Sequence, residues 1–257
     1  MLFGHEDERD DPAGVAVPRL VVFDVDGTLT DTADVDSECF AAAIVEEFGI
    51  RDLNTRWSSY TEFTDSSIIE EVFEVHRGTG PTTDEISRLI ERFVGILERA
   101  QAAEPERFAP IQGAPALVSG LTADDGWRVA VATGGWERSA RLKLAFARID
   151  IGSAPLASAE VSRSRAEIVR WAIDRATRGL PGSGFGRIVL VGDTLWDLRM
   201  AREFGLPFVG VGRGAEGREL ALRGADVVVE SFRNYGTIVR ILSTAGSPGR
   251  PRAEGRP

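Results

Sequence analysis

Short, almost wholly apolar runs recur along this chain, and most of them are followed by a segment with helical periodicity. Apolar runs of this length are typical of strands that are buried on both faces, as in a parallel sheet. The predicted strands are residues 20–23, 129–132, 188–191, 208–211 and 227–229. Helices are predicted over residues 137–148, 165–178 and 197–204. This order predicts an α/β fold with a doubly wound parallel sheet.

The first two predicted strands lie too far apart in the sequence for a single crossover connection. The segment between them holds amphipathic stretches at 36–48, 67–76 and 84–100. We therefore predict an inserted all-α cap domain over 35–108 and a core of residues 18–34 and 109–243. Residues 1–17 and 244–257 are polar, charged or rich in Gly and Pro, and are predicted to be disordered tails. The alternative is that the inserted helices only cover one face of the sheet.

The overall charge limits the classes of partner. The 257 residues carry a formal net charge of −10, which disfavours binding to nucleic acids or anionic membranes, because both require a basic face. Cys39 is the only cysteine, so no internal disulfide forms, as suits a reducing compartment. The acidic N-terminal segment lacks the pattern of a secretory signal, and we expect a cytoplasmic location. The oligomeric state is not indicated.

Acidic side chains follow two of the predicted strands directly. Asp24 and Asp26 come after the strand at 20–23, and Gly27 permits a sharp turn there. Asp193 and Asp197 come after the strand at 188–191, four residues apart. Ligands of doubly wound folds bind at the carboxyl ends of the strands, and buried charges need partners there. Oxygen ligands of this kind suit Mg²⁺.

A third strand end carries small and hydroxylated residues. Thr133, Gly134 and Gly135 follow the strand at 129–132, and a helix is predicted from about residue 137. A threonine hydroxyl can donate to a phosphate oxygen, and glycines let backbone amides approach it closely. The positive end of the following helix would also favour an anion.

Together these motifs resemble those of the haloacid dehalogenase-like superfamily, and the layout is similar to its phosphoglycolate phosphatase-like subgroup with a helical C1 cap. The resemblance implies a Rossmann-like core and a phosphoric monoester hydrolase that acts on a small phosphorylated metabolite. It makes Asp24 the nucleophile that forms an aspartyl-phosphate, and Asp26 the general acid and then base. Dehalogenating members lack the second aspartate, so Asp26 favours phosphoryl transfer.

The resemblance also implies the ligand sets. Mg²⁺ would be bound by Asp24, Asp193 and the backbone carbonyl of Asp26, and Asp197 would bind a metal-bound water or a ligand. Thr133 and Gly134 would bind the phosphate.

One departure from the family pattern concerns a lysine. Relatives usually place a lysine between the Thr133 and Asp193 motifs to hold the nucleophile and the phosphate, and this chain has none in the expected place. Its sole lysine, Lys143, lies on the helix that follows Thr133. We expect Arg165, or alternatively Arg163, to replace the missing lysine, because a guanidinium binds phosphate bidentately.

Two other functions remain open. Sugar-phosphate mutase relatives tend to carry a histidine about ten residues beyond the acid/base aspartate, where this chain has Asp36. A mutase is therefore disfavoured but not excluded. The second alternative is a non-catalytic relative that binds a phospholigand or a protein. The segment 64–66 (Thr-Asp-Ser) is a candidate polar loop of the cap that faces the site.

Overall fold

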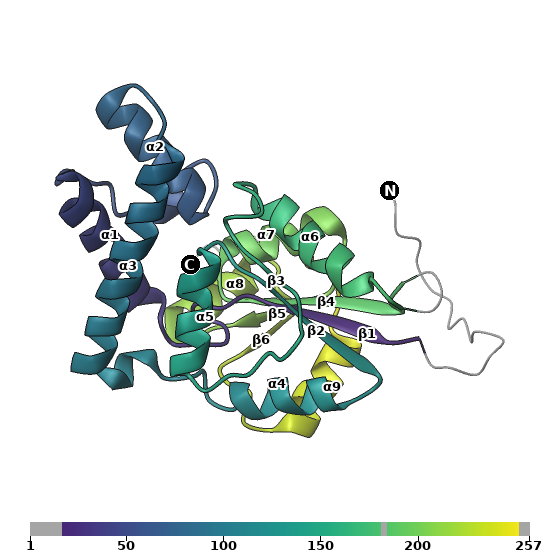
Figure 1. Ribbon diagram of the computed structural model, residues 1–257. Helices are drawn as coiled ribbons and strands as arrows, with labels where there is room; N and C mark the ends of the chain where they lie inside the picture. The colour runs from purple at the N-terminus through teal and green to yellow at the C-terminus, as the bar shows by residue number, and fades with distance from the viewer. Residues whose placement is uncertain (1–16, 181–183, 252–257) are drawn as a thin grey trace.

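The fold is built on a parallel six-stranded sheet with strand order β3-β2-β1-β4-β5-β6 (Figure 1). A computed structural model describes residues 17–180 and 184–251. The strands are β1 (Arg19–Phe23), β2 (Trp127–Ala132), β3 (Leu156–Ala157), β4 (Arg187–Gly192), β5 (Phe208–Val211) and β6 (Val227–Val229). The predicted doubly wound α/β class is confirmed. The strand order reverses beside β1, so the loops after β1, β2 and β4 meet at one edge.

Helices cover both faces of the sheet. The side chains of β1 alternate, with Val21 and Phe23 in one buried apolar cluster and Leu20 and Val22 in the other. The first cluster is closed by α4 (Ala114–Ala123), α5 (Glu137–Phe146) and α9 (Tyr235–Thr244). The second is closed by α6 (Arg165–Thr177), α7 (Leu195–Phe204) and α8 (Gly214–Leu222). Burial on both faces explains why the strand sequences do not alternate with polar residues.

The segment between β1 and α4 forms a helical unit, called the cap below. It contains α1 (Ala33–Phe48), η1 (Trp57–Ser59), α2 (Asp65–Arg77), α3 (Thr83–Ala103) and η2 (Pro105–Phe108). These helices stand beside the sheet rather than over a face (Figure 1), and they enclose an apolar cluster of their own. Trp136, from the loop after β2, is fully buried in that cluster and packs edge-on against Phe40 and Phe93. The cap thus shares part of its core with the site loop.

The C-terminal segment differs from the sequence-based expectation. Residues 244–257 were expected to be a disordered tail, yet Arg187 donates a hydrogen bond to the carbonyl of Ala245, and Phe208 N–H donates to the carbonyl of Gly246. Such backbone anchoring leaves no mark in residue composition, which is why polarity alone misplaced the boundary. Residues 1–16 and 252–257 of the predicted tails lie outside the described residues. No helix among the described residues has the length and apolar character needed to cross a membrane.

The start of α3 gives a test of the cap. Thr82 Oγ1 accepts from Glu85 N–H while the Glu85 carboxylate accepts from Thr82 N–H, which forms a capping box. We expect Thr82→Ala to lower the free energy of unfolding by about 1 kcal/mol, because the cap is lost. Thr83→Ala, one residue further on the same exposed surface, is the control and should change it by less than about 0.5 kcal/mol. Chemical denaturation followed by circular dichroism measures both, and equal losses would contradict the capping role.

Candidate active site

Asp24 lies at the carboxyl end of β1, where its own backbone is still part of the sheet. Its N–H donates to the Val191 carbonyl of β4 at 3.0 Å, and the chain then turns so that Gly27 N–H donates to Thr30. Gly27 has a φ of +74°, and a Cβ there would lie 2.1 Å from Asp193 Oδ2. Glycine is therefore required both by the turn and by the close approach of the second acidic motif.

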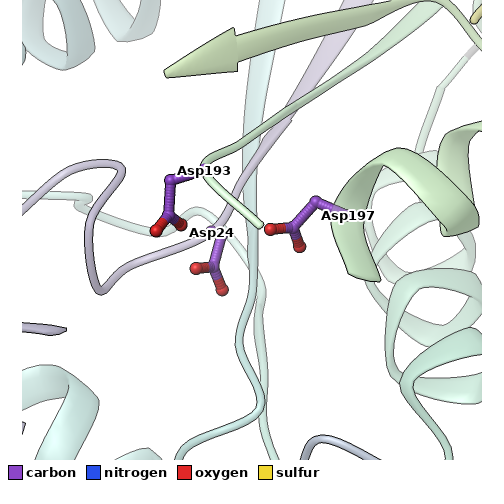
Figure 2. A group of neighbouring side chains, drawn as sticks. All are labelled: Asp24, Asp193 and Asp197. Atoms are coloured by element: carbon purple, nitrogen blue, oxygen red, sulfur yellow. The ribbon is translucent and has the colours of Figure 1, made fainter. Parts of the chain in front are cut away.

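Three carboxylates converge at this edge of the sheet. Ligand atoms of Asp24, Asp193 and Asp197 lie within 4.8 Å of one another, and Figure 2 shows their carboxylates around a common point. Thr28 Oγ1 donates to Asp193 Oδ1 at 3.0 Å, which joins the β1 turn to the β4 loop. Asp197 Oδ2 accepts from the N–H and hydroxyl of Thr194 in the capping box that begins α7. The helix start thus fixes the orientation of Asp197.

Arg165 is the cation that contacts this group. It is the first residue of α6, and its Nη2 lies 2.8 Å from Asp24 Oδ1 and 2.7 Å from Asp197 Oδ1. Its side chain is 3% exposed, and its Nε is buried without a hydrogen-bond partner among the described residues. Arg163, the alternative, is 60% exposed and pairs with Glu70 on α2 at 2.6 Å. Of the two arginines, the structure brings only Arg165 to Asp24.

The group carries more negative charge than Arg165 offsets. Burial raises the pKa of Asp24 to about 7, against the opposing attraction of Arg165, and neighbouring carboxylates raise it further. Burial and repulsion from Asp24 likewise hold the pKa of Asp193 well above its ordinary value. Oδ2 of Asp24 accepts no hydrogen bond from the described residues. An excess of buried carboxylate oxygen of this kind fits a hard divalent cation, which would lower the cost of ionising the group.

Thr133 lies at the end of β2, beside the cap. Its hydroxyl oxygen accepts from Gly135 N–H at 3.1 Å, which leaves the hydroxyl proton for another acceptor. Gly134 lies beneath the cap loop, since a Cβ there would be 2.4 Å from the Phe63 carbonyl oxygen and 2.7 Å from Arg165 Nη1. Gly134 therefore lies between Arg165 and the Phe63 carbonyl of the cap.

The amino end of α5 was expected to face a bound anion, but carboxylates of the protein itself accept from its first amides. Trp136 N–H donates to Asp65 Oδ2 at 3.0 Å and Glu137 N–H donates to Glu160 Oε2 at 2.7 Å. Protein carboxylates thus already occupy these amides. Asp65 belongs to the candidate polar loop of the cap, and its own N–H donates to the Gly134 carbonyl at 2.8 Å. Sequence patterns did not indicate this contact, because Asp65 and Trp136 are far apart in the chain.

Asp26 points into a second charged group. Its Oδ1 accepts from Thr32 Oγ1 at 2.6 Å, and its Oδ2 accepts from Lys143 Nζ at 2.6 Å. Lys143 is fully buried and also pairs with Asp36 of α1. Burial alone would lower the pKa of Lys143, but the two carboxylates raise it above its ordinary value.

This contact of Lys143 was missed by sequence reasoning. The available signal was the position of the only lysine on the same helix face as Ala140 and Leu144, which are both buried. A charged residue on an apolar helix face needs a buried partner.

The sequence and the fold of this chain are similar to those of known proteins. A protein-family model described as haloacid dehalogenase-like hydrolase matches residues 18–205. None of the curated proteins matches the chain significantly.

Solved structures match over most of the chain. A hydrolase from Pseudomonas syringae has a TM-score of 0.63 and 21% identity, covering 89% of this chain and 100% of that one. CbbY from Rhodobacter sphaeroides, in complex with phosphate, has a TM-score of 0.59 and 22% identity, covering 84% and 96%. A candidate β-phosphoglucomutase from Bacteroides vulgatus has a TM-score of 0.61 and 18% identity, covering 88% and 89%. At these identities the likeness shows a shared fold.

Neighbouring glycines give a matched test of the contact between the cap and the site loop. We expect Gly134→Ala to separate the two, because its Cβ would clash with the Phe63 carbonyl, and to lower stability by roughly 1–3 kcal/mol. Hydrogen exchange should become faster at Asp65 N–H, which donates to the Gly134 carbonyl. In Gly135→Ala the nearest atom to the new Cβ is 3.5 Å away, so exchange should change little. Equal exchange in the two variants would contradict the close approach.

Proposed function

The chain belongs to the haloacid dehalogenase-like hydrolases, whose family model covers well over half of it, and we propose that it is a Mg²⁺-dependent phosphatase of small phosphomonoesters. The observation that supports this best is the convergence of Asp24, Asp193 and Asp197 around a shared point, with Arg165 held against Asp24. A carboxylate nucleophile, ligands for a cation and a donor for phosphate are thereby combined at one edge of the sheet.

In the proposed first step, a carboxylate oxygen of Asp24 attacks phosphorus, and the bond from phosphorus to the leaving oxygen breaks. Asp26 gives its proton to that oxygen, so an alcohol departs. In the second step Asp26 takes a proton from water as the water oxygen attacks phosphorus. The bond between Asp24 and phosphorus then breaks, which releases phosphate and restores the Asp24 carboxylate and the protonated form of Asp26.

We assign phosphate binding to groups whose hydrogen-bond donors are not already used by contacts within the protein. Arg165 Nε has no partner among the described residues, and a buried donor without a partner is costly until a ligand oxygen accepts from it. The Thr133 hydroxyl retains its proton for a ligand oxygen, and Gly134 has no side chain to fill the space beside Arg165 Nη1. Arg163 and the amino end of α5 are engaged with protein carboxylates and are not assigned to phosphate.

The residues at the site fit Mg²⁺. Asp24, Asp193 and the backbone carbonyl of Asp26 would hold the ion. Asp197 would act at longer range, since Arg165 and Thr194 already engage its two oxygens. When bound, the ion neutralises charge on the transferring phosphoryl group.

The subgroup, the cellular location and the substrate class are proposals as well. We place the chain with the phosphoglycolate phosphatase-like enzymes, in the cytoplasm, with a small phosphorylated metabolite as substrate. The mutase alternative is less favoured, because Asp36 stands where mutase relatives tend to carry histidine, and its carboxylate is paired with Lys143. A non-catalytic binder would have no need of both Asp24 and Asp26.

The nucleophile is tested by substitution. We expect Asp24→Asn to lower phosphate release from 4-nitrophenyl phosphate in the presence of Mg²⁺ by at least about 10³-fold, because an amide cannot form the aspartyl-phosphate. Asp31→Asn removes an exposed carboxylate of the same segment and is the control, with activity close to that of the wild type. Activity that survives Asp24→Asn would overturn the mechanism, and no release from a broad panel of phosphate esters would favour a binding protein.

The metal is tested by a binding measurement as well as by chelation. Mg²⁺ should raise the unfolding temperature of the wild type, because it binds the folded state only. Asp193→Asn should weaken Mg²⁺ binding in calorimetry by about 100-fold or more, whereas the exposed Asp174→Asn on α6 should leave it unchanged. Excess chelator should abolish phosphate release. Full activity in chelator would exclude a metal requirement.

A further inference from the structure

We propose that Lys143 is a positioning residue that holds the Asp26 carboxylate, and that Asp36 fixes Lys143 from the cap side. The inference rests on the proposed function, in which Asp26 protonates the leaving group. It adds to that function a residue outside the motifs that carry the family resemblance. Lys143 acts through Asp26 and does not contact the substrate in this proposal.

The contact joins three elements that are far apart in the sequence. Asp26 lies in the turn after β1, Asp36 lies on α1 of the cap, and Lys143 lies on α5 of the core. Nζ donates to Asp26 Oδ2 at 2.6 Å and also to Asp36 Oδ1. Because Thr32 donates to Asp26 Oδ1, both carboxylate oxygens are held and the side chain has little rotational freedom.

Lys143 is a costly residue for this place in the fold. Its side chain is fully buried, on a helix face shared with Ser139, Ala140 and Leu144. Apolar residues of similar volume often replace buried ion pairs without loss of stability, so packing alone does not call for a lysine here. A lysine has a reason to be here if it holds the Asp26 carboxylate in one orientation, which an apolar residue cannot do.

How much the reaction needs Asp26 depends on the leaving group of the phosphate ester. The ratio kcat/KM covers the steps up to phosphoryl transfer onto Asp24. An alkyl phosphate needs its leaving oxygen protonated in that transfer, whereas 4-nitrophenolate departs as a stable anion. Misplacing Asp26 should therefore slow the alkyl ester much more than the aryl ester.

The kinetic test compares Lys143→Met with the double variant Lys143→Met/Asp36→Asn. The single variant leaves the partly buried carboxylates of Asp26 and Asp36 without a cation. The double variant restores the original net charge of the group, because one positive and one negative charge are removed together. We expect its unfolding temperature to recover most of what the single variant loses.

Activity should not recover in the same way. We expect kcat/KM for a simple alkyl phosphate to fall by about 100-fold or more in both variants, and for 4-nitrophenyl phosphate by less than about tenfold. A purely structural role predicts equal losses for the two esters, or recovery of both together with the unfolding temperature. Either result would overturn the proposal.

The only lysine of the chain allows a second test that needs no turnover. Labelling with ¹⁵Nζ-lysine gives a single side-chain ammonium signal in NMR spectra. Its protons should exchange slowly with water because the group is buried and hydrogen-bonded. Asp26→Asn and Asp36→Asn should each shift the signal, while Asp34→Asn, exposed two residues earlier on α1, should not.

The two tests separate the possible failures. If Asp26→Asn leaves the Nζ signal unchanged, Lys143 does not hold Asp26 and the inference is wrong, whatever the activity. If the signal responds but the wild type hydrolyses no phosphate ester, the proposed function is wrong and the contact stands. A responding signal together with the leaving-group dependence supports both.

Discussion

Buried carboxylates in excess over cations are the feature on which the site depends. Two neighbouring groups each combine several aspartates with one cation, three in the first group and two in the second. In the first the cation is Arg165, and in the second it is Lys143. The aspartates are Asp24, Asp193 and Asp197 in the first group, and Asp26 and Asp36 in the second. Each group therefore has unbalanced negative charge, which only backbone amides, hydroxyls and a bound cation can offset.

The doubly wound parallel class of the sheet and the first group could be predicted from sequence, because both follow from local patterns, whereas the two-residue strand β3 was not among the predicted strands. Residues directly after a buried parallel strand must lie at its carboxyl edge, and neighbouring strands bring these edges together. That reasoning was sufficient to place Asp24 and Asp193 close to each other. Arg165 was expected instead from the lysine that the family pattern places there and this chain lacks, with Arg163, two residues earlier, as the alternative. Only the direction in which α6 begins distinguishes them.

The second group could not be predicted, because its members come from the cap and the core. Where Asp36 faces depends on how α1 packs against the core, and no short sequence pattern encodes that packing. The same limit explains the misplaced C-terminal boundary, which depends on hydrogen bonds from Arg187 to backbone carbonyls. Tertiary contacts between distant segments decide such features, and composition alone does not reveal them.

The use of an arginine in one group and a lysine in the other follows from their surroundings. Arg165 reaches two carboxylates through one nitrogen, and in the part of the chain that the structure describes its Nε has no partner, which a planar guanidinium permits. Lys143 has a compact ammonium with three donors, so it fits fully buried between two carboxylates from different segments. A guanidinium there would have to bury additional donors. The single lysine of an otherwise arginine-rich chain therefore stands where a small buried charge is required.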